Sequence, residues 1–321
     1  MSISESDIKF YKASNNNDTS SNGGRIGTTE IPDSLLNNLF PNISSAERVA
    51  GITRYRKAFL RNENLSDLTM YSGEVWIGVK STSADYFQLK DGIDTDVQSE
   101  AEAYTNWAGT GLLNSSVGSG ESSISVDYDT PTGVWNGAAI HIDDGTNELD
   151  TSVVSEPSWV GNNATFSISG ELGNNYTATT TVVSTIVDLA NIEASSNGWV
   201  ETSSAGTYNE TTYPPTLYNV GTVSDAWTLT FSNATAFSVV GTVTGFVGYG
   251  DTSTDCRPIN GSSYYFLLDK DGWGGSWSAG DTVTFNTVHA GKGFWVKEVV
   301  PAGIASYSNN TVRLDWRGES A

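Results

Sequence analysis

The chain has 321 residues and a formal net charge of −21, because 37 acidic residues outnumber 16 basic ones. Such a surface repels nucleic acid and anionic membranes, so neither is expected as a partner. Ten Trp, fourteen Tyr and eleven Phe exclude a disordered acidic chain, and the many Ser, Thr, Asn and Gly residues favour strands joined by tight turns. The length predicts about two or three domains.

Residues 1–32 are expected to form an N-terminal arm. The short apolar segment 8–11 is followed by a polar run, SNNNDTSSNGGRIGTTE, in which no apolar period is visible. Arms of this kind often become ordered only against a neighbouring molecule, so this one is expected to take part in assembly.

Residues 33–110 are expected to combine helices with strands and to form a docking region. One short helix is expected over residues 33–40. A longer one is expected over residues 44–61, where Ser44 and Glu47 have the spacing of a capping box.

The helix expected over residues 44–61 carries a basic face in an otherwise acidic chain. That face is either solvated or a docking surface for an acidic partner, including another copy of this chain. With three residues of the arm, it gives the candidate protein-interaction residues Phe10, Tyr11, Arg25, Arg48, Arg54, Arg56, Lys57 and Arg61.

The rest of the chain reads as strands. The run GEVWIGVKS alternates with the period of a half-buried strand, and a helical turn is expected within residues 94–109. Residues 111–200 are expected to form a middle β module, because short alternating runs are separated by turns such as Asp144-Gly145. Residues 201–321 are expected to form a C-terminal β-sandwich module. The predicted fold is therefore mainly β, with two β-sandwich or small-barrel (Ig-like) modules, a short helical N-terminal region and a polar arm.

The sequence predicts no enzyme and no cofactor. It has only two histidines, and it lacks the nucleophile elbow, the P-loop and the zinc-protease motif. His141 should point away from Ile140 and Ile142 on a strand, solvated or paired with a turn carboxylate, and His289 should lie at a strand end. The abundance of carboxylates leaves a polysaccharide-cleaving enzyme open as an alternative.

A calcium loop is suggested, but not completed, by residues 263–281. Asp269 and Asp271 run into Gly272, yet either register of an EF-hand loop loses essential ligands. These carboxylates are therefore expected to serve turn formation, and no metal site is predicted, although a calcium site with distant partners stays open at Asp269 and Asp271.

Aromatic residues surround the same turn. They cover the protein core, anchor a contact, or form a platform on which a sugar stacks. The residues of this possible ligand platform are Tyr264, Tyr265, Trp273 and Trp277.

Both ends of the chain resemble a group of structural proteins from tailed bacteriophages. The N-terminal resemblance lies in IKFYKASNNNDTSSNGGRI and SAERVAGITRYRKAF. The other segments are DAWTLTFSNATAFSVVG, WSAGDTVTFNT and FWVKEVVPAGIASYSNNTVRLDWRGES. Together they cover about half of the chain, and they contain no chemical signature.

This resemblance implies a virion component that is assembled in the cytoplasm of the host bacterium. The expected place is the neck, at the head–tail junction, as a collar-type protein that forms a homo-oligomeric ring. The implied partners are other virion proteins: the connector, portal, tail or capsid proteins. The alternative is a head-surface decoration protein, or a tail or fibre-associated protein that binds glycans during host adhesion.

Overall fold

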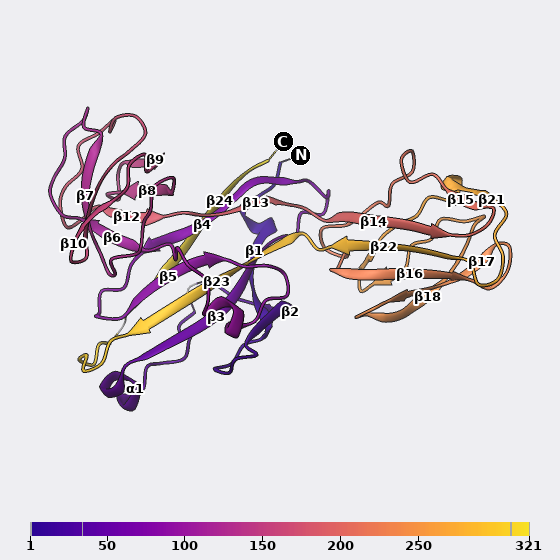
Figure 1. Cartoon of the computed structure of the whole chain (residues 1–321), viewed down its shortest axis with the longest axis horizontal. Coiled ribbons are helices and arrows are strands. Elements are labelled where there is room, and N and C mark those ends of the chain that lie inside the picture. The colour runs from indigo at the N-terminus through magenta and orange to yellow at the C-terminus, as the bar shows by residue number, and fades with distance from the viewer. Residues whose placement is uncertain (1, 34, 309, 321) are drawn as a thin grey trace.

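The computed structural model describes residues 2–33, 35–308 and 310–320, and the chain is mainly β, as expected. Figure 1 shows three lobes in a row along the long axis of the molecule. A central domain lies between two lobes that leave it on opposite sides and that we name the first insert (residues 109–186) and the second insert (residues 194–289).

The central domain consists of two packed sheets. The five-stranded sheet has the order β2 (Gly23–Glu30), β1 (Ile8–Asn15), β3 (Ile52–Asn62), β23 (Gly291–Val300) and β5 (Tyr86–Asp91). The three-stranded sheet has the order β13 (Val187–Ile192), β4 (Met70–Val79) and β24 (Arg313–Ser320). Short helices flank them: η1 (Glu5–Asp7), α1 (Ser45–Ala50) and α2 (Gln98–Ala101).

The core of the central domain lies between these two sheets. Leu60 and Phe294 contribute from the five-stranded sheet, and Val75 and Ile77 from β4. Because side chains alternate along a strand, Trp76 lies on the opposite face of β4, where the first insert covers it. The expected alternating strand at residues 73–81 is thus confirmed by β4.

The first insert is a seven-stranded antiparallel sheet around its own core. Its order is β10 (Ser158–Val160), β11 (Asn163–Ser167), β7 (Ser123–Tyr128), β6 (Thr110–Leu113), β12 (Val182–Thr185), β8 (Ala139–Asp143) and β9 (Glu148–Ser152). Alternate residues of each strand face inward, among them Val126, Ile140, Ile142 and Phe166.

The second insert is built on a five-stranded sheet. Its order is β14 (Ser195–Thr202), β22 (Thr282–Val288), β16 (Asp225–Phe231), β17 (Ala236–Gly241) and β18 (Gly245–Asp251). Smaller elements close its ends: β15 (Gly206–Tyr208) pairs with β21 (Trp273–Gly275), β19 (Ile259–Asn260) pairs with β20 (Ser263–Tyr264), and η2 (Lys270–Gly272) precedes β21. Trp227, Leu229 and Phe231 point into its aromatic core.

The expected N-terminal arm is instead a β-hairpin of the central sheet. Residues 8–12 of β1 pair with β3, and β2 forms the outer edge. The arm prediction was wrong because Ile8 and Phe10 pack into the core between the two sheets and Tyr11 and Ala13 pack on the opposite face of β1, while the polar residues 16–22 form the hairpin turn.

Of the two expected helices, the one over residues 44–61 is much shorter than expected, and no helix forms over residues 35–40. The capping box is confirmed, since the Glu47 amide donates to Ser44 Oγ and the Ser44 amide donates to Glu47 Oε2, but α1 ends at Ala50. Gly51 follows in the left-handed region with φ 75°, which ends the helix, and β3 begins at the next residue. Residues 35–40 form turns and bends, and Ser34 lies outside the described residues.

The sheets also cross the expected domain boundaries. Residues 111–200 contain β13, and residues 201–321 contain β23 and β24, yet all three strands pair within the central domain. That domain is assembled from three separate stretches of chain, and such long-range pairing leaves no local signal in the sequence.

The short helix α2 confirms the helical turn expected within residues 94–109. Among the residues that the structure describes, no helix is long and apolar enough to cross a membrane.

Candidate functional site

The candidate site is a cluster of polar side chains on the hairpin of β8 and β9. In the ladder, His141 lies opposite Asp150, and Asp143 lies opposite Glu148. Residues two apart share one face of a strand, so all four side chains project from the same side of the hairpin. Ile140 and Ile142 project from the other side into the core of the first insert.

His141 is buried at the junction with the central domain. Its Nδ1 lies 2.8 Å from Asp150 Oδ1, and its ring packs against Trp76 of β4 at a tilt of 36°, with 4.8 Å between centroids. The sequence prediction of a paired histidine is confirmed, but the carboxylate comes from the neighbouring strand rather than from a turn.

The surroundings of His141 favour the neutral form of its ring. Burial lowers its pKa below the ordinary value, although the charges of Glu148 and Asp143 act in the opposite direction. Because a carboxylate only accepts hydrogen bonds, Nδ1 carries the proton and donates to Asp150, which leaves a lone pair on Nε2. Among the described residues, Nε2 has no hydrogen-bond partner.

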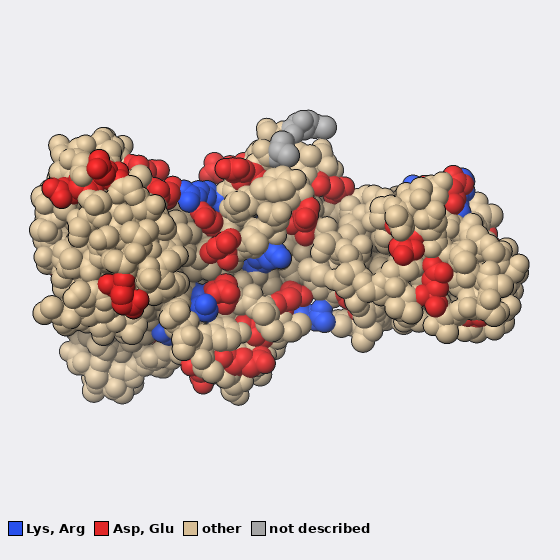
Figure 2. Space-filling model, turned by 45° about the horizontal axis from the view of Figure 1, so that its top comes forward, with Lys and Arg blue, Asp and Glu red and all other residues tan. Residues whose placement is uncertain are grey.

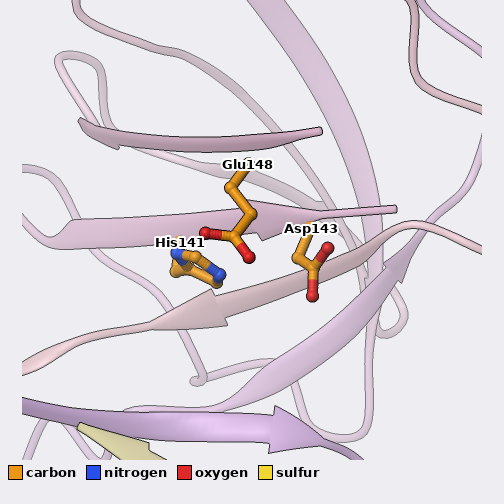
Figure 3. Close-up of side chains that lie close together, drawn as sticks. All are labelled: His141, Asp143 and Glu148. Carbon is orange, nitrogen blue, oxygen red and sulfur yellow. The ribbon is translucent and has the colours of Figure 1, made fainter. Parts of the chain in front are cut away.

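Two carboxylates converge on this histidine. One ring nitrogen of His141 and one oxygen each of Asp143 and Glu148 lie within 4.8 Å of one another, and Figure 3 shows the three side chains pointing toward each other. Asp143 Oδ1 accepts a hydrogen bond from the Gly145 amide at 2.6 Å. Glu148 is exposed and has no hydrogen-bond partner in the described part of the chain.

The cluster borders an open hollow between the first insert and the central domain. The hollow has a volume of about 470 Å³ and is lined by Gly78, Val79, Asp143, Asp144, Gly145, Thr146, Glu148, Thr180, Val182 and Arg313. Asp143 and Glu148 are therefore reachable from solvent.

Arg317 of β24 connects the cluster to the central domain. Its Nε lies 2.5 Å from Glu74 Oε2 on β4, its Nη1 pairs with Asp150, and its guanidinium lies 5.7 Å from the ring centre of Trp76. Asp150 thus accepts from both His141 and Arg317, and it fixes the hairpin against the three-stranded sheet.

The second insert meets the central domain at a different junction, which contains the other histidine. His289 Nε2 lies 2.8 Å from Asp94 Oδ1, and Arg25 Nη1 donates to the Ser224 carbonyl at 2.5 Å. Burial raises the pKa of Asp94, but the hydrogen bond and charge of His289 outweigh it and hold the pKa at about 2. Arg61 Nη2 also donates a hydrogen bond across this junction, to the Val220 carbonyl at 2.7 Å.

Three of the candidate interaction residues lie inside the central domain. Arg54 pairs with Glu298 at 2.5 Å, Arg56 with Asp18 at 2.6 Å and Lys57 with Asp96 at 2.5 Å. The expected helical docking face does not form here, because these side chains project from β3, a strand covered on both faces. Burial of these cations requires partners within the chain.

The remaining candidate interaction residues also make contacts within the chain. The Phe10 ring packs against Phe294, and the Tyr11 hydroxyl donates to Glu63 at 2.8 Å. Arg48 bonds to the Ile43 carbonyl at 3.0 Å. Their role in contacts with a partner stays a prediction.

The aromatic residues of the possible ligand platform pack on the second insert. Trp277 is only 4% exposed and stacks on Phe231 with 4.3 Å between centroids, and Trp273 packs edge-on against both rings. Tyr264 and Tyr265 are partly buried. Of the three expected roles, covering the core is the one that Trp273 and Trp277 fulfil in the structure.

The carboxylates of the incomplete calcium loop serve local structure. Asp269 caps η2, because its Oδ1 accepts from the Asp271 amide at 2.8 Å, and Asp271 pairs with Lys270. Neither residue belongs to the cluster of possible metal ligands found among the described residues.

Sequence reasoning named His141 but missed Asp143 and Glu148. The signal was present: a His-x-Asp strand, a turn beginning Asp-Gly and a Glu-x-Asp strand place all four polar side chains on one face once the hairpin register is known.

Comparison with protein-family models, with curated proteins and with solved structures gave no match.

Proposed function

We propose that this chain is a structural component of a tailed-phage virion, located at the neck and assembling as a ring through protein–protein contacts. The observation that carries the proposal is the position of the segments that resemble phage structural proteins. Segments from the two ends of the chain are neighbouring strands: Tyr11 of β1 lies opposite Phe59 of β3, and Ala58 of β3 lies opposite Phe294 of β23.

The other resembling segments are also neighbours in space. Residues 225–241 and 277–287 contribute β16, β17 and β22, and Trp227 lies opposite Phe285 in their ladder. A similarity that is scattered along the sequence therefore covers continuous parts of two sheets. This arrangement favours a shared structural module over a chance likeness of short strings.

The distribution of charge supports contacts through the central domain. Residues 109–186 contain no Lys or Arg, and the second insert contains only Arg257 and Lys270. Figure 2 shows most of the basic side chains of that face over the middle of the molecule. A ring uses one surface against a different surface of the next copy, so the basic side chains of the central domain can face the acidic inserts of a neighbouring copy.

Exposed apolar residues mark the segment before β3 as a contact candidate. Leu35, Leu36 and Val49 are 58%, 67% and 76% exposed. Such side chains on the surface of a soluble domain are used in contacts with other proteins. The Ig-like character of the two inserts stays part of this proposal.

The test is quantitative mass spectrometry of purified particles from a phage that encodes this chain. A ratio to the major capsid protein that corresponds to about a dozen copies or fewer supports a neck ring. Hundreds of copies move the protein to the head surface. Absence from the particle overturns the proposal.

A variant pair tests the contact segment. Val49→Asp should reduce incorporation into particles, whereas Val160→Asp, at a 79% exposed position of the first insert, should not. Deletion of residues 1–32 is unsuitable as a test, because it removes β1 and β2 from the central sheet. Equal incorporation of both variants contradicts a contact through Val49.

A further inference from the structure

We propose that His141, Asp143 and Glu148 bind a divalent transition-metal cation of the Zn²⁺ type at the junction of the first insert with the central domain. One imidazole nitrogen and two carboxylates are a donor set that suits such a cation. The inference goes beyond the proposed virion role and does not depend on it.

The first support is a histidine nitrogen without a hydrogen-bond partner in the described part of the chain. The side chain of His141 is 7% exposed, and Nδ1 is engaged by Asp150. Nε2 therefore carries a lone pair, and the two other groups of the cluster, Asp143 and Glu148, are also acceptors. Such a set is electrostatically unfavourable until a cation occupies its centre.

The second support is the arrangement around the histidine. A metal-binding histidine generally donates its other ring N–H to a carboxylate, which fixes the tautomer and orients the ring. Asp150 occupies that position here, and Arg317 holds Asp150 in place from the central domain. The Trp76 ring, which packs against the imidazole, further restricts its rotation.

The third support is local charge. The first insert contains acidic residues but no Lys or Arg, so its field attracts cations. The nearest basic residues belong to β24 and are already paired: Arg313 with Asp315 at 2.6 and 2.7 Å, and Arg317 with Glu74 and Asp150.

A small movement completes the geometry. Tetrahedral ligands around zinc are about 3.3 Å apart, so the cluster must contract from its present span of 4.8 Å. Glu148 is exposed and makes no hydrogen bond within the described residues, so its side chain is free to rotate toward the other two ligands. The adjoining hollow gives the ion access from solvent and leaves space for a water molecule as fourth ligand.

The bound ion would fasten the β8–β9 hairpin. His141 and Asp150 already contact β4 and β24, whereas Asp143 and Glu148 project into the hollow. Joining His141 to Asp143 and Glu148 through a cation makes the hairpin more rigid and holds His141 in the orientation in which it contacts Trp76, and this is the structural role that we assign to the ion.

The experiment is a titration of the full chain with Zn²⁺, followed by ¹⁵N NMR of the imidazole nitrogens. The chain contains only His141 and His289, so two sets of signals are resolved and His289 serves as an internal reference. The expected result is a large shift of His141 Nε2 that saturates at one ion per chain, with His289 unchanged. An unshifted His141 overturns the proposal.

Variants separate this site from unspecific binding to the acidic surface. Glu148→Gln changes an exposed side chain and should weaken zinc binding by at least tenfold, as measured by calorimetry. Asp150→Asn should weaken it by about 10–100-fold through loss of the oriented ring. The control Glu156→Gln, at an exposed position of the same insert, should bind as the wild type does. Equal affinity of Glu148→Gln and Glu156→Gln refutes the assignment.

Calcium provides a further discrimination. Ca²⁺ takes six to eight oxygen ligands, so an equal concentration should neither shift His141 Nε2 nor displace Zn²⁺. Displacement by equimolar Ca²⁺ contradicts a site that contains nitrogen.

Discussion

Each insert meets the central domain beside one of the two histidines, and each histidine pairs with an aspartate, but the two junctions differ. At the second insert, His289 is 4% exposed, its Nδ1 is buried without a partner, and a Cβ placed on Gly291 would lie 2.8 Å from that nitrogen. At the first insert, one ring nitrogen of His141 lies within 4.8 Å of two carboxylates that line an open hollow.

The difference shows that a His–Asp pair does not define a site by itself. The role of the histidine depends on which groups face its second ring nitrogen. Packed backbone and the Phe59 ring enclose His289, so this histidine only stabilises the junction. His141 instead faces two carboxylates that are accessible to solvent, which is the environment of a metal ligand. Four variants test this contrast, from the largest expected effect to the smallest.

The largest effect is expected when the buried Lys57–Asp96 ion pair next to the second junction is removed. Lys57 Nζ pairs with Asp96 at 2.5 Å and donates to the Ile93 carbonyl at 2.6 Å, so it holds the loop that carries Asp94. Lys57→Met leaves the Asp96 carboxylate buried without its cation and should lower the free energy of unfolding by about 3–5 kcal/mol. Urea denaturation followed by tryptophan fluorescence measures this.

The matched control is Lys270→Met, which removes an exposed ion pair on the second insert. Its denaturation curve should coincide with that of the wild type. A Lys57→Met curve that also coincides with the wild type contradicts a supporting role for the buried pair.

The next variant breaks the first junction. Trp76 is 6% exposed and contacts both His141 and Arg317. Trp76→Ala should cost about 3 kcal/mol and speed amide hydrogen exchange in β8 and β9, while exchange in β16 and β22 stays unchanged. Tyr249→Ala, at an 82% exposed position, is the control and should alter neither region. Uniform acceleration across all three lobes contradicts a separate junction.

The third variant uses pH at the second junction. The folded pKa of Asp94, about 2, is below its ordinary value of 3.8. Its contribution to stability is therefore present above pH 3.8 and is lost as pH falls toward 2. Asp94→Asn should be less stable than the wild type by at most about 2 kcal/mol at pH 7, and the two should converge near pH 2. Denaturation at a series of pH values checks this, and a difference that stays constant contradicts it.

The smallest effect is expected at Arg317. Its side chain is 40% exposed, so Arg317→Gln should cost at most about 1 kcal/mol. A double-mutant cycle with Asp150→Asn should show coupling across the first junction. Arg313→Gln, whose partner Asp315 lies in the same strand, should show no coupling with Asp150. Equal coupling of both arginines to Asp150 would contradict the assigned link.

Local alternation allowed much of the inserts to be predicted. The orientation of His141 against Ile140 and Ile142, the turn at Asp144-Gly145 and the strand of Trp227 all follow from patterns within a few residues. The metal-ligand cluster could not be predicted, because the pairing of Asp143 with Glu148 depends on a hairpin register that the sequence leaves open.

The central domain was predicted less well for two physical reasons. Its neighbouring strands come from distant segments, as the pairing of Ala58 with Phe294 shows. The charges of Arg54 and Lys57 also suggested a solvated helical face, because only the tertiary structure reveals the buried carboxylates that neutralise them. Gly51 was the available local signal that the helix ends.

The position of β23 also has a consequence for synthesis on the ribosome. This strand lies between β3 and β5 in the five-stranded sheet, although more than two hundred residues separate it from β3 in the chain. The N-terminal strands emerge first, yet their sheet cannot close until residues 291–300 have left the exit tunnel. Both inserts, whose strands pair only within themselves, are complete before that moment. β23 is therefore the last strand to join the five-stranded sheet, at a time when both inserts can already have folded.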